Sequence, residues 1–289
     1  MRIGLIGHSH SVCLMDALGK WRDQLGETPR RKRDGYADAY GGWDEIDTSK
    51  ILIRLPGRRI GRFTADLVCA VIFGGSDDYE LVGASVGTDK SVTIFPTETL
   101  AKICAGFADC DLIVSVVFGN ELAPHIWTDD LPAYDFIEES LPGPLRPGAQ
   151  PIDRRYIGSI LHEYASRVQA TCLMMRRLCP RAGIAHVMPP PPLEDPSRLK
   201  FLEGFDDAIA KAGLLDARLR QKWYRAYAAK LKALLYQGGI ALVPPPPAAV
   251  DGKGFFREYL SNGLTHGNAT YGGMVWESVA ANINVTPVQ

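Results

Sequence analysis

The 289-residue sequence has no long hydrophobic run, no excess of charge of either sign and no closely paired cysteines. No apolar stretch approaches the ~20 residues of a membrane-spanning helix, so no membrane association is expected. The formal net charge of -1 gives no reason to expect nucleic-acid binding. The six cysteines lack a C-x-x-C pair, which favours buried reduced thiols. A first strand predicted to start at residue 2 leaves no room for a signal peptide, so we expect a cytoplasmic protein.

Two common glycine motifs are also missing. The first apolar run is followed by Gly7, but the G-x-G-x-x-G motif of dinucleotide-binding proteins is absent. The pentapeptide from Gly7 to Ser11 lacks the final glycine of the G-x-S-x-G nucleophile elbow. These absences argue against a nucleotide-binding protein and against the α/β-hydrolase family proper.

The sequence does contain a strand, a tight turn and a helix at its start. The apolar run Ile3 to Ile6 is bounded by Gly7 and predicts a buried strand, and residues 12–25 have helical periodicity. Ser9 lies on the turn between them, at the end of a strand, where open α/β sheets bind their ligands. A helix N-terminus there supplies positive partial charge. Ser9 is therefore a candidate nucleophile, and its alternative role is that of a helix N-cap.

Strand-like and helix-like segments then alternate along the chain. The clearest strand is residues 111–118, and two similar strands, 183–188 and 239–243, each stop at four prolines. The alternation predicts a doubly wound, mostly parallel sheet with helices on both faces, a flavodoxin-like three-layer α/β/α domain. We expect one domain over residues 1–289, with an inserted or lid-like segment at about 26–75.

Three chemically useful residues fall at the predicted edge of this sheet. Ser9 follows the first strand, Asn120 follows the strand at 111–118, and His266 lies in the last loop. A serine, a histidine that takes its proton and an amide donor that holds an oxyanion are what acyl transfer requires. A turn asparagine and a surface histidine are the alternatives without function.

This set resembles the SGNH (GDSL-like) hydrolase superfamily. Gly7 to Ser9 stand where that family has Gly-Asp-Ser, and Gly119 to Glu121 stand where it has the oxyanion asparagine. Residues 262–272 resemble its C-terminal His-Pro-Asn-x-x-Gly-Tyr segment. The family's second block, a glycine, is matched by Gly83 or Gly87, of which Gly87 is preferred.

The resemblance implies a serine esterase that acts on a small ester or O-acylated molecule without a metal or organic cofactor. It implies that Ser9 is the nucleophile and His266 the base, with Ser9, Gly87 and Asn120 as the oxyanion hole. Further residues expected to line the pocket are His8, His10 and Glu121.

One departure from the family pattern matters most. The family has an aspartate three residues before its histidine, and this chain has Gly263. A main-chain carbonyl could orient His266 instead, or a carboxylate of Asp251, Glu258 or Glu121. The alternatives that stay open are an O-acyltransferase, a catalytically impaired binding protein, and a metal-dependent hydrolase that would use the first two histidines. The sequence leaves the acyl group, the alcohol and the oligomeric state undetermined.

Overall fold

Six strands form the central sheet, in the order β10-β9-β6-β1-β3-β2. The structure, a computed structural model, describes residues 1–19, 52–72, 81–119, 127–128, 133–199 and 206–282. The five parallel strands are β1 (Arg2–Gly7), β3 (Phe63–Val71), β6 (Leu112–Val116), β9 (Gly183–Val187) and β10 (Ala241–Val243). Counted along the chain, they follow the spatial order 2-1-3-4-5 of flavodoxin-like folds. The sixth strand, β2 (Leu52–Ile60), is antiparallel to β3, so the predicted mostly parallel sheet is confirmed.

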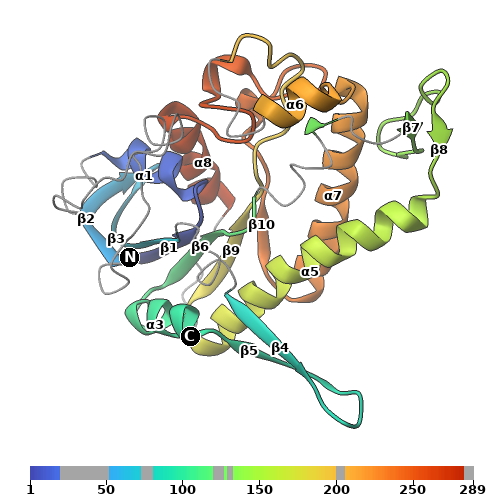
Figure 1. Cartoon of the computed structure of the whole chain (residues 1–289). Coiled ribbons are helices and arrows are strands. Elements are labelled where there is room, and N and C mark those ends of the chain that lie inside the picture. Colours follow the sequence, from blue (N-terminus) through green and yellow to red (C-terminus); the bar gives the residue numbers. More distant parts are fainter. Residues whose placement is uncertain (20–51, 73–80, 120–126, 129–132, 200–205, 283–289) are drawn as a thin grey trace.

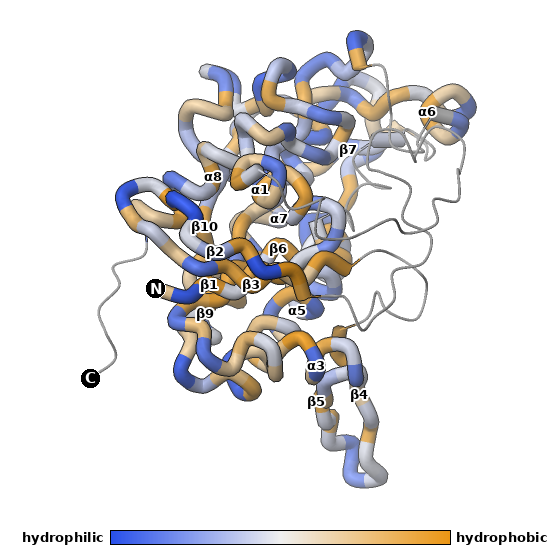
Figure 2. Tube along the Cα trace, turned by 90° about the vertical axis from the view of Figure 1, so that its left-hand side faces the viewer, coloured by the Kyte–Doolittle hydropathy of each residue, from blue (hydrophilic) through white to orange (hydrophobic). Residues whose placement is uncertain are grey.

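Helices cover both faces of the sheet (Figure 1). On one face, α1 (Ser11–Leu18) packs against α8 (Ala269–Asn282). On the other face α5 (Arg154–Leu178) packs against α3 (Glu98–Gly106) and α7 (Ala217–Gln237), and the short helix α6 (Asp206–Ala212) precedes α7. Hydrophobic residues concentrate along the central strands (Figure 2). None of the described helices is long and apolar enough to cross a membrane.

A glycine brings the two ends of the chain together. A Cβ atom at Gly272 of α8 would lie 2.0 Å from the carbonyl oxygen of Cys13 in α1, which is far inside van der Waals contact. Only glycine therefore allows α8 to approach α1 this closely. The contact places the loop that precedes α8 beside the turn that precedes α1.

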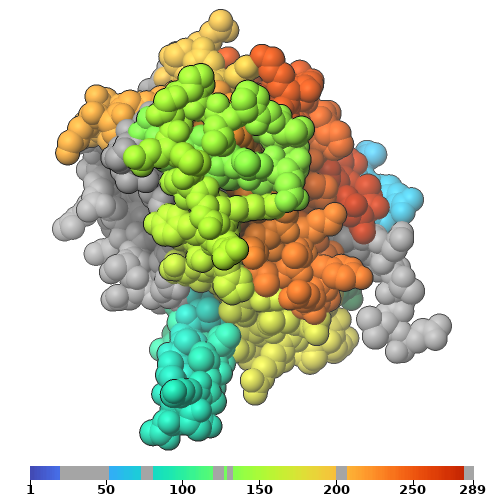
Figure 3. Space-filling model, turned by 90° about the vertical axis from the view of Figure 1, so that its right-hand side faces the viewer, coloured from blue at the N-terminus to red at the C-terminus, as the bar shows by residue number. Residues whose placement is uncertain are grey.

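Two expectations about the middle of the chain need correction. Residues 52–72 were expected inside an insertion, but they form β2 and β3 of the central sheet, whereas residues 26–51 lie outside the described residues. Gly83 and Gly87 were matched to the family's second glycine block, but Gly83 lies in β4 (Val82–Val86), which pairs with β5 (Val92–Pro96), and Gly87 directly follows β4. This hairpin projects from the body of the molecule (Figures 1 and 3).

Smaller elements complete the described chain. The two-residue strands β7 (Tyr134–Asp135) and β8 (Gln150–Pro151) pair in the excursion before α5. Two short 3-10 helices, Pro247–Ala249 and Glu258–Leu260, lie between β10 and α8.

Candidate active site

Ser9 lies on the turn that joins β1 to α1. The Ser9 carbonyl oxygen accepts a hydrogen bond from the amide of Val12 at 3.1 Å, so the turn runs directly into the helix. β1 has β3 on one side and β6 on the other, so the strand order reverses between β1 and β6. This reversal is the topological switch point at which doubly wound folds bind ligands beyond the carboxyl ends of the strands. Ser9 is partly exposed there.

The structure brings Ser9 into contact with His266. The His266 Nε2 atom lies 2.6 Å from the Ser9 Oγ atom, although 257 residues separate the two in the chain. The His266 side chain is 2 % exposed. Its loop is fixed by a hydrogen bond from the amide of Asn262 to the His266 carbonyl oxygen, at 2.8 Å. The two residues that the sequence singled out therefore have the distance of a hydrogen-bonded nucleophile and base.

The hydroxyl group of the preceding residue meets the other ring nitrogen of His266. The Thr265 Oγ1 atom lies 2.9 Å from His266 Nδ1. The carboxylate of Asp251 instead accepts hydrogen bonds from main-chain amides of its own loop, and that of Glu258 lies 3.9 Å from Arg198. Glu121 is outside the described residues. Sequence reasoning missed Thr265, because the family pattern directs attention to the position three residues before the histidine.

The two expected pocket histidines have different surroundings. The His10 ring stacks on the His266 ring, with centroids 4.3 Å apart and planes 19° apart. His8 Nδ1 accepts a hydrogen bond from the amide of Phe118 at 3.2 Å. Phe118 has a φ of 56°, a left-handed conformation that is uncommon for a residue other than glycine. His8 therefore fixes the turn after β6, and His10 fixes the plane of the His266 ring.

The expected oxyanion donors are not all at this site. Gly119 lies beside His10, because a Cβ atom at Gly119 would come within 2.2 Å of the His10 ring. The next residue, Asn120, lies outside the described residues. Gly87 is in the exposed β4–β5 hairpin, where its amide donates to the carbonyl oxygen of Ser91 at 2.8 Å. The expectation for Gly87 is therefore corrected, since its amide is already used and the hairpin projects away from α1 (Figure 1).

A second serine–histidine contact lies inside the core. The Ser115 Oγ atom of β6 is 3.2 Å from His186 Nδ1 of the neighbouring strand β9. Both side chains are at most 1 % exposed. Burial lowers the pKa of His186 to about 3, so the ring is neutral at neutral pH. A substrate cannot reach this pair without opening the sheet, so the contact belongs to the packing of the core.

A metal site would need several ligand side chains close together. Among the residues that the structure describes, no three His, Cys, Asp or Glu side chains gather closely enough to hold a metal. The two histidines of the metal alternative, His8 and His10, contact Phe118 and His266 as described above.

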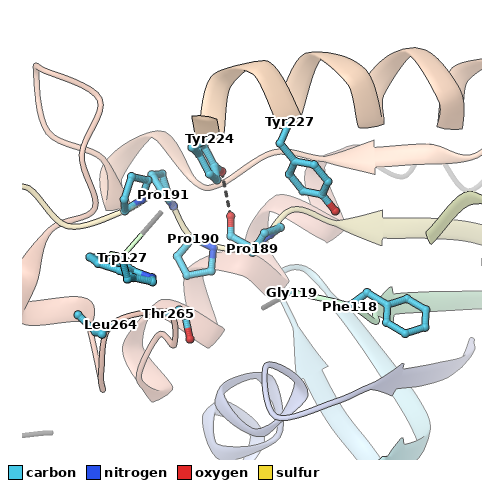
Figure 4. A pocket seen from close by; sticks show the side chains of 11 residues that line it. Phe118, Gly119, Trp127, Pro189, Pro190, Pro191, Tyr224, Tyr227, Leu264 and Thr265 are labelled. Carbon is cyan, nitrogen blue, oxygen red and sulfur yellow. Dashed lines mark hydrogen bonds between the residues drawn. The ribbon is translucent and has the colours of Figure 1, made fainter. Parts of the chain in front are cut away.

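An apolar pocket has Thr265, the residue before His266, in its wall (Figure 4). We call it the proline–aromatic pocket; its lining residues are Phe118, Gly119, Trp127, Pro189, Pro190, Pro191, Pro192, Tyr224, Tyr227, Leu264 and Thr265. The Tyr224 hydroxyl donates to the carbonyl oxygen of Pro189 at 2.9 Å and holds the proline segment against α7. Thr265 both lines the pocket and contacts His266 through its hydroxyl.

No family model and no curated protein matches the chain. Several solved structures match over nearly its whole length. The periplasmic domain of a lipopolysaccharide acetyltransferase from Salmonella ser. Paratyphi A is 10% identical, with 97% of this chain and 82% of that chain covered and a TM-score of 0.43. The lipase Lip_vut3 from a goat rumen metagenome is 14% identical, with 97% and 96% covered and a TM-score of 0.41.

A third structure, from Parabacteroides merdae and described as a GDSL-like lipase, is 12% identical, with 96% and 95% covered and a TM-score of 0.42. The chemistry of this chain has to be inferred from its own residues, because the identities and TM-scores are low. Among the solved structures that match it nearly end to end are proteins described as a GDSL-like lipase and as an SGNH hydrolase, and an acetyltransferase domain covered over 82% of its own length.

Proposed function

We propose that this protein is a serine hydrolase that cleaves a small ester through an acyl-enzyme. The observation that carries the proposal is the 2.6 Å contact between Ser9 Oγ and His266 Nε2 at the switch point of the sheet. A serine hydroxyl is a weak nucleophile by itself, and an adjacent imidazole that takes its proton activates it. The buried Ser115–His186 pair lacks the access that this chemistry needs.

The reaction proceeds in two steps. In the first, Ser9 Oγ attacks the acyl carbon, and the Ser9 proton moves to His266 Nε2. The tetrahedral intermediate collapses when the bond to the alcohol oxygen breaks, and His266 Nε2 gives its proton to that oxygen. In the second step water attacks the acyl-enzyme, His266 takes a proton from the water, and the acid leaves as Ser9 Oγ regains its proton.

The negative charge of the tetrahedral intermediate needs donors close to Ser9. The main-chain amide of Ser9 lies at the N-terminal end of α1, where the helix dipole favours negative charge. The second donor that we propose is the side chain of Asn120, which directly follows Gly119 in the chain after β6. Gly119, the residue before it, lies against the His10 ring, which in turn stacks on the His266 ring.

Thr265 takes the place of the missing carboxylate as a positioning residue. When His266 Nδ1 donates its hydrogen to Thr265 Oγ1, Nε2 is left unprotonated and can accept the Ser9 proton. The Thr265 hydroxyl orients the His266 ring as a carboxylate would, but it adds no negative charge. The protein therefore has a Ser–His pair with a neutral orienting group.

Replacing Thr265 tests this role. Thr265→Val keeps the shape of the side chain but removes the acceptor, and we expect kcat for a small ester to fall by about tenfold, the value of one hydrogen bond of ~1.4 kcal/mol. KM should change little, because the substrate is bound as before. Thr265→Ser restores the oxygen and should recover most of the kcat. An equal loss in both variants, or a loss confined to KM, would contradict a positioning role.

A fluorophosphonate probe tests the proposed function directly. The wild-type protein should form a covalent adduct that peptide mass spectrometry locates on Ser9, and Ser9→Ala should remove it. Two serines are matched controls, Ser11 at the start of α1 and Ser115 in the buried serine–histidine contact. Ser11→Ala and Ser115→Ala should both keep the adduct. An adduct on Ser115, or labelling that survives Ser9→Ala, would overturn the proposal.

Product analysis then identifies the acceptor of the acyl group. With a simple acetate ester in water we expect free acetic acid, which marks a hydrolase. Preferential formation of a new ester when an alcohol is added would instead mark an O-acyltransferase that uses the same acyl-enzyme.

A further inference from the structure

We propose that the β4–β5 hairpin is a dimerisation surface, on which the apolar face of the hairpin packs against the same face of a second copy of this chain. The hairpin projects from the body of the molecule beside α3, where a second copy can reach it (Figures 1 and 3). None of its residues belongs to the Ser9–His266 contact, so dimerisation is testable independently of the proposed function.

One face of the hairpin is apolar over its whole length. Residues that pair across two antiparallel strands share a face, and so do residues two apart along one strand. Six apolar residues occupy the three cross-strand pairs of this face, which are Val82–Pro96, Ala84–Ile94 and Val86–Val92. The residues between them form the other face, which includes the polar pair of Ser85 and Thr93.

This apolar face is open to water in the single chain. The exposed fraction is 72 % for Val86, 63 % for Val92 and 41 % for Ile94, and only Val82 and Pro96 at the base are partly buried. One apolar and one mixed face are the pattern of an antiparallel sheet that packs on one side. A two-stranded hairpin without such packing is only marginally stable in water. The face therefore has the character of a surface that another surface covers.

The two ends of the hairpin have complementary charges. The tip bears Asp89 and Lys90, and the rest of residues 82–96 is uncharged. Just beyond the base, α3 begins with Glu98, which is exposed and pairs with Lys102 at 2.8 Å. Each end thus has one negative and one positive side chain. Two hairpins aligned in opposite directions would place the charges of one tip against those of the other base.

The spacing of these charges fits a two-fold dimer. Ile94, in the middle of the apolar face, comes four residues after Lys90 and four residues before Glu98. A two-fold axis that crosses the strands at the Ala84–Ile94 pair stacks the apolar faces with reversed strand direction. The same axis brings Lys90 of each copy to Glu98 of the other, and it leaves the two bodies at opposite ends of the stacked hairpins. Such an isologous contact closes after two copies.

The charge at the tip argues against a membrane as the covering surface. Anionic bilayers attract apolar segments that carry an excess of positive charge. Here Asp89 directly precedes Lys90. The hydroxyl and the amide of Ser91 donate to the Asp89 carboxylate at 2.6 and 2.9 Å and lower its pKa, so Asp89 is ionised at neutral pH. The tip is therefore neutral overall, as an exchange of charges between identical copies requires.

Sedimentation velocity of the full chain tests the dimer. Because six residues a side are fewer than the ~20–30 of a standard interface, we expect wild type to pass from monomer to dimer between about 1 and 100 µM. Val92→Glu puts a charge on the apolar face and should stay monomeric at the highest concentration. Thr93→Glu is the matched control, because it puts the same charge on the other face of the same strand, and it should dimerise like wild type. Thermal melts check that both variants are folded.

Two results would overturn the dimer. One is a wild type that is monomeric at every concentration, and the other is a dimer that survives Val92→Glu. Vesicles of phosphatidylglycerol provide the competing surface. Binding of a monomeric wild type to them, lost in Val92→Glu and kept in Thr93→Glu, would assign the apolar face to a membrane and refute the dimer.

A mixing experiment tests the two-fold axis. Lys90→Glu and Glu98→Lys each place like charges together twice in a homodimer, so each variant alone should dimerise with a Kd raised about fivefold or more. Mixed in equal amounts, the two variants restore both opposite-charge contacts, and the heterodimer should form with a Kd within about twofold of wild type. A mixture that associates no better than either variant alone would refute this arrangement of the two copies.

Discussion

Removing Ser9 and His266 together should cost no more activity than removing either one. We expect kcat for a small ester to fall by about 10⁴-fold or more in Ser9→Ala, and by a similar factor in His266→Ala. The double variant should lie at the same residual level. The reason is that the 2.6 Å contact makes the two side chains one unit, in which the base has no function without the nucleophile and the nucleophile is inactive without the base. Steady-state kinetics of the four proteins on one ester measures this.

The controls address folding and the second serine–histidine contact. All variants should unfold within a few degrees of wild type, which thermal melts can check. Ser115→Ala should keep kcat within a few-fold, because Ser115 is buried in β6. Losses that multiply in the double variant would show that the two residues act independently, and the proposed mechanism would then be wrong.

The part of the site that the sequence predicted depends on rules of parallel sheets. An apolar run that ends in a glycine and is followed by a helical pattern identifies β1 and the turn that holds Ser9. The carboxyl ends of parallel strands meet at one edge, so the end of β6 was expected near the turn after β1, and Gly119 indeed lies against His10. His266 was found through the resemblance of the last loop to the family pattern, and the packing of α8 on α1 explains why it reaches Ser9.

The predictions about the site that were wrong or incomplete depend on three-dimensional contacts, which the spacing of residues in the sequence does not reveal. Gly87 was chosen through the resemblance, as the match to the family's second glycine block, but residues 82–86 and 92–96 pair with each other as a hairpin. The partner with which a strand pairs depends on the tertiary structure, and a glycine is compatible both with a loop and with a strand of a hairpin. Thr265 was missed because its role depends on which way a side chain next to the histidine points.

A second large effect is expected far from the site, at a buried ion pair between α7 and the excursion before α5. The Lys222 ammonium donates to both carboxylate oxygens of Asp135, at 2.7 and 2.8 Å, and to the carbonyl oxygen of Phe136 at 2.9 Å. The carboxylate also accepts from the amides of Phe136 at 2.7 Å and Arg146 at 2.8 Å. The two side chains are 2 % and 5 % exposed. Every proton of the ammonium is therefore used, and the carboxylate is held by four donor contacts.

Lys222→Met should lower the free energy of unfolding by about 3–5 kcal/mol, as measured by urea denaturation at pH 7. The methionine fills a similar volume, but it leaves the Asp135 carboxylate buried without its cation. Lys102→Met is the matched control, because Lys102 pairs with Glu98 on the surface of α3 at 2.8 Å. Loss of that exposed pair should cost less than about 1 kcal/mol. Equal, small effects of the two substitutions would contradict a structural role for the buried pair.

The pH dependence of the difference in unfolding free energy between wild type and Lys222→Met provides an independent check. Burial by itself would raise the pKa of Asp135, but the hydrogen bonds from Lys222 and from the two amides outweigh it and lower the pKa below its usual value. The stability that Asp135 contributes is therefore fully present above its unfolded pKa of ~3.9 and is lost as the pH falls through the lower folded value. In Lys222→Met the Asp135 carboxylate stays buried but loses its cation. Protonation of Asp135 at acid pH removes this unpaired charge and therefore reduces the destabilisation of the variant. The gap in unfolding free energy between wild type and Lys222→Met should thus narrow below about pH 4. A gap that stays constant from pH 7 to pH 3 would mean that the variant is destabilised by lost packing and that the ion pair contributes little.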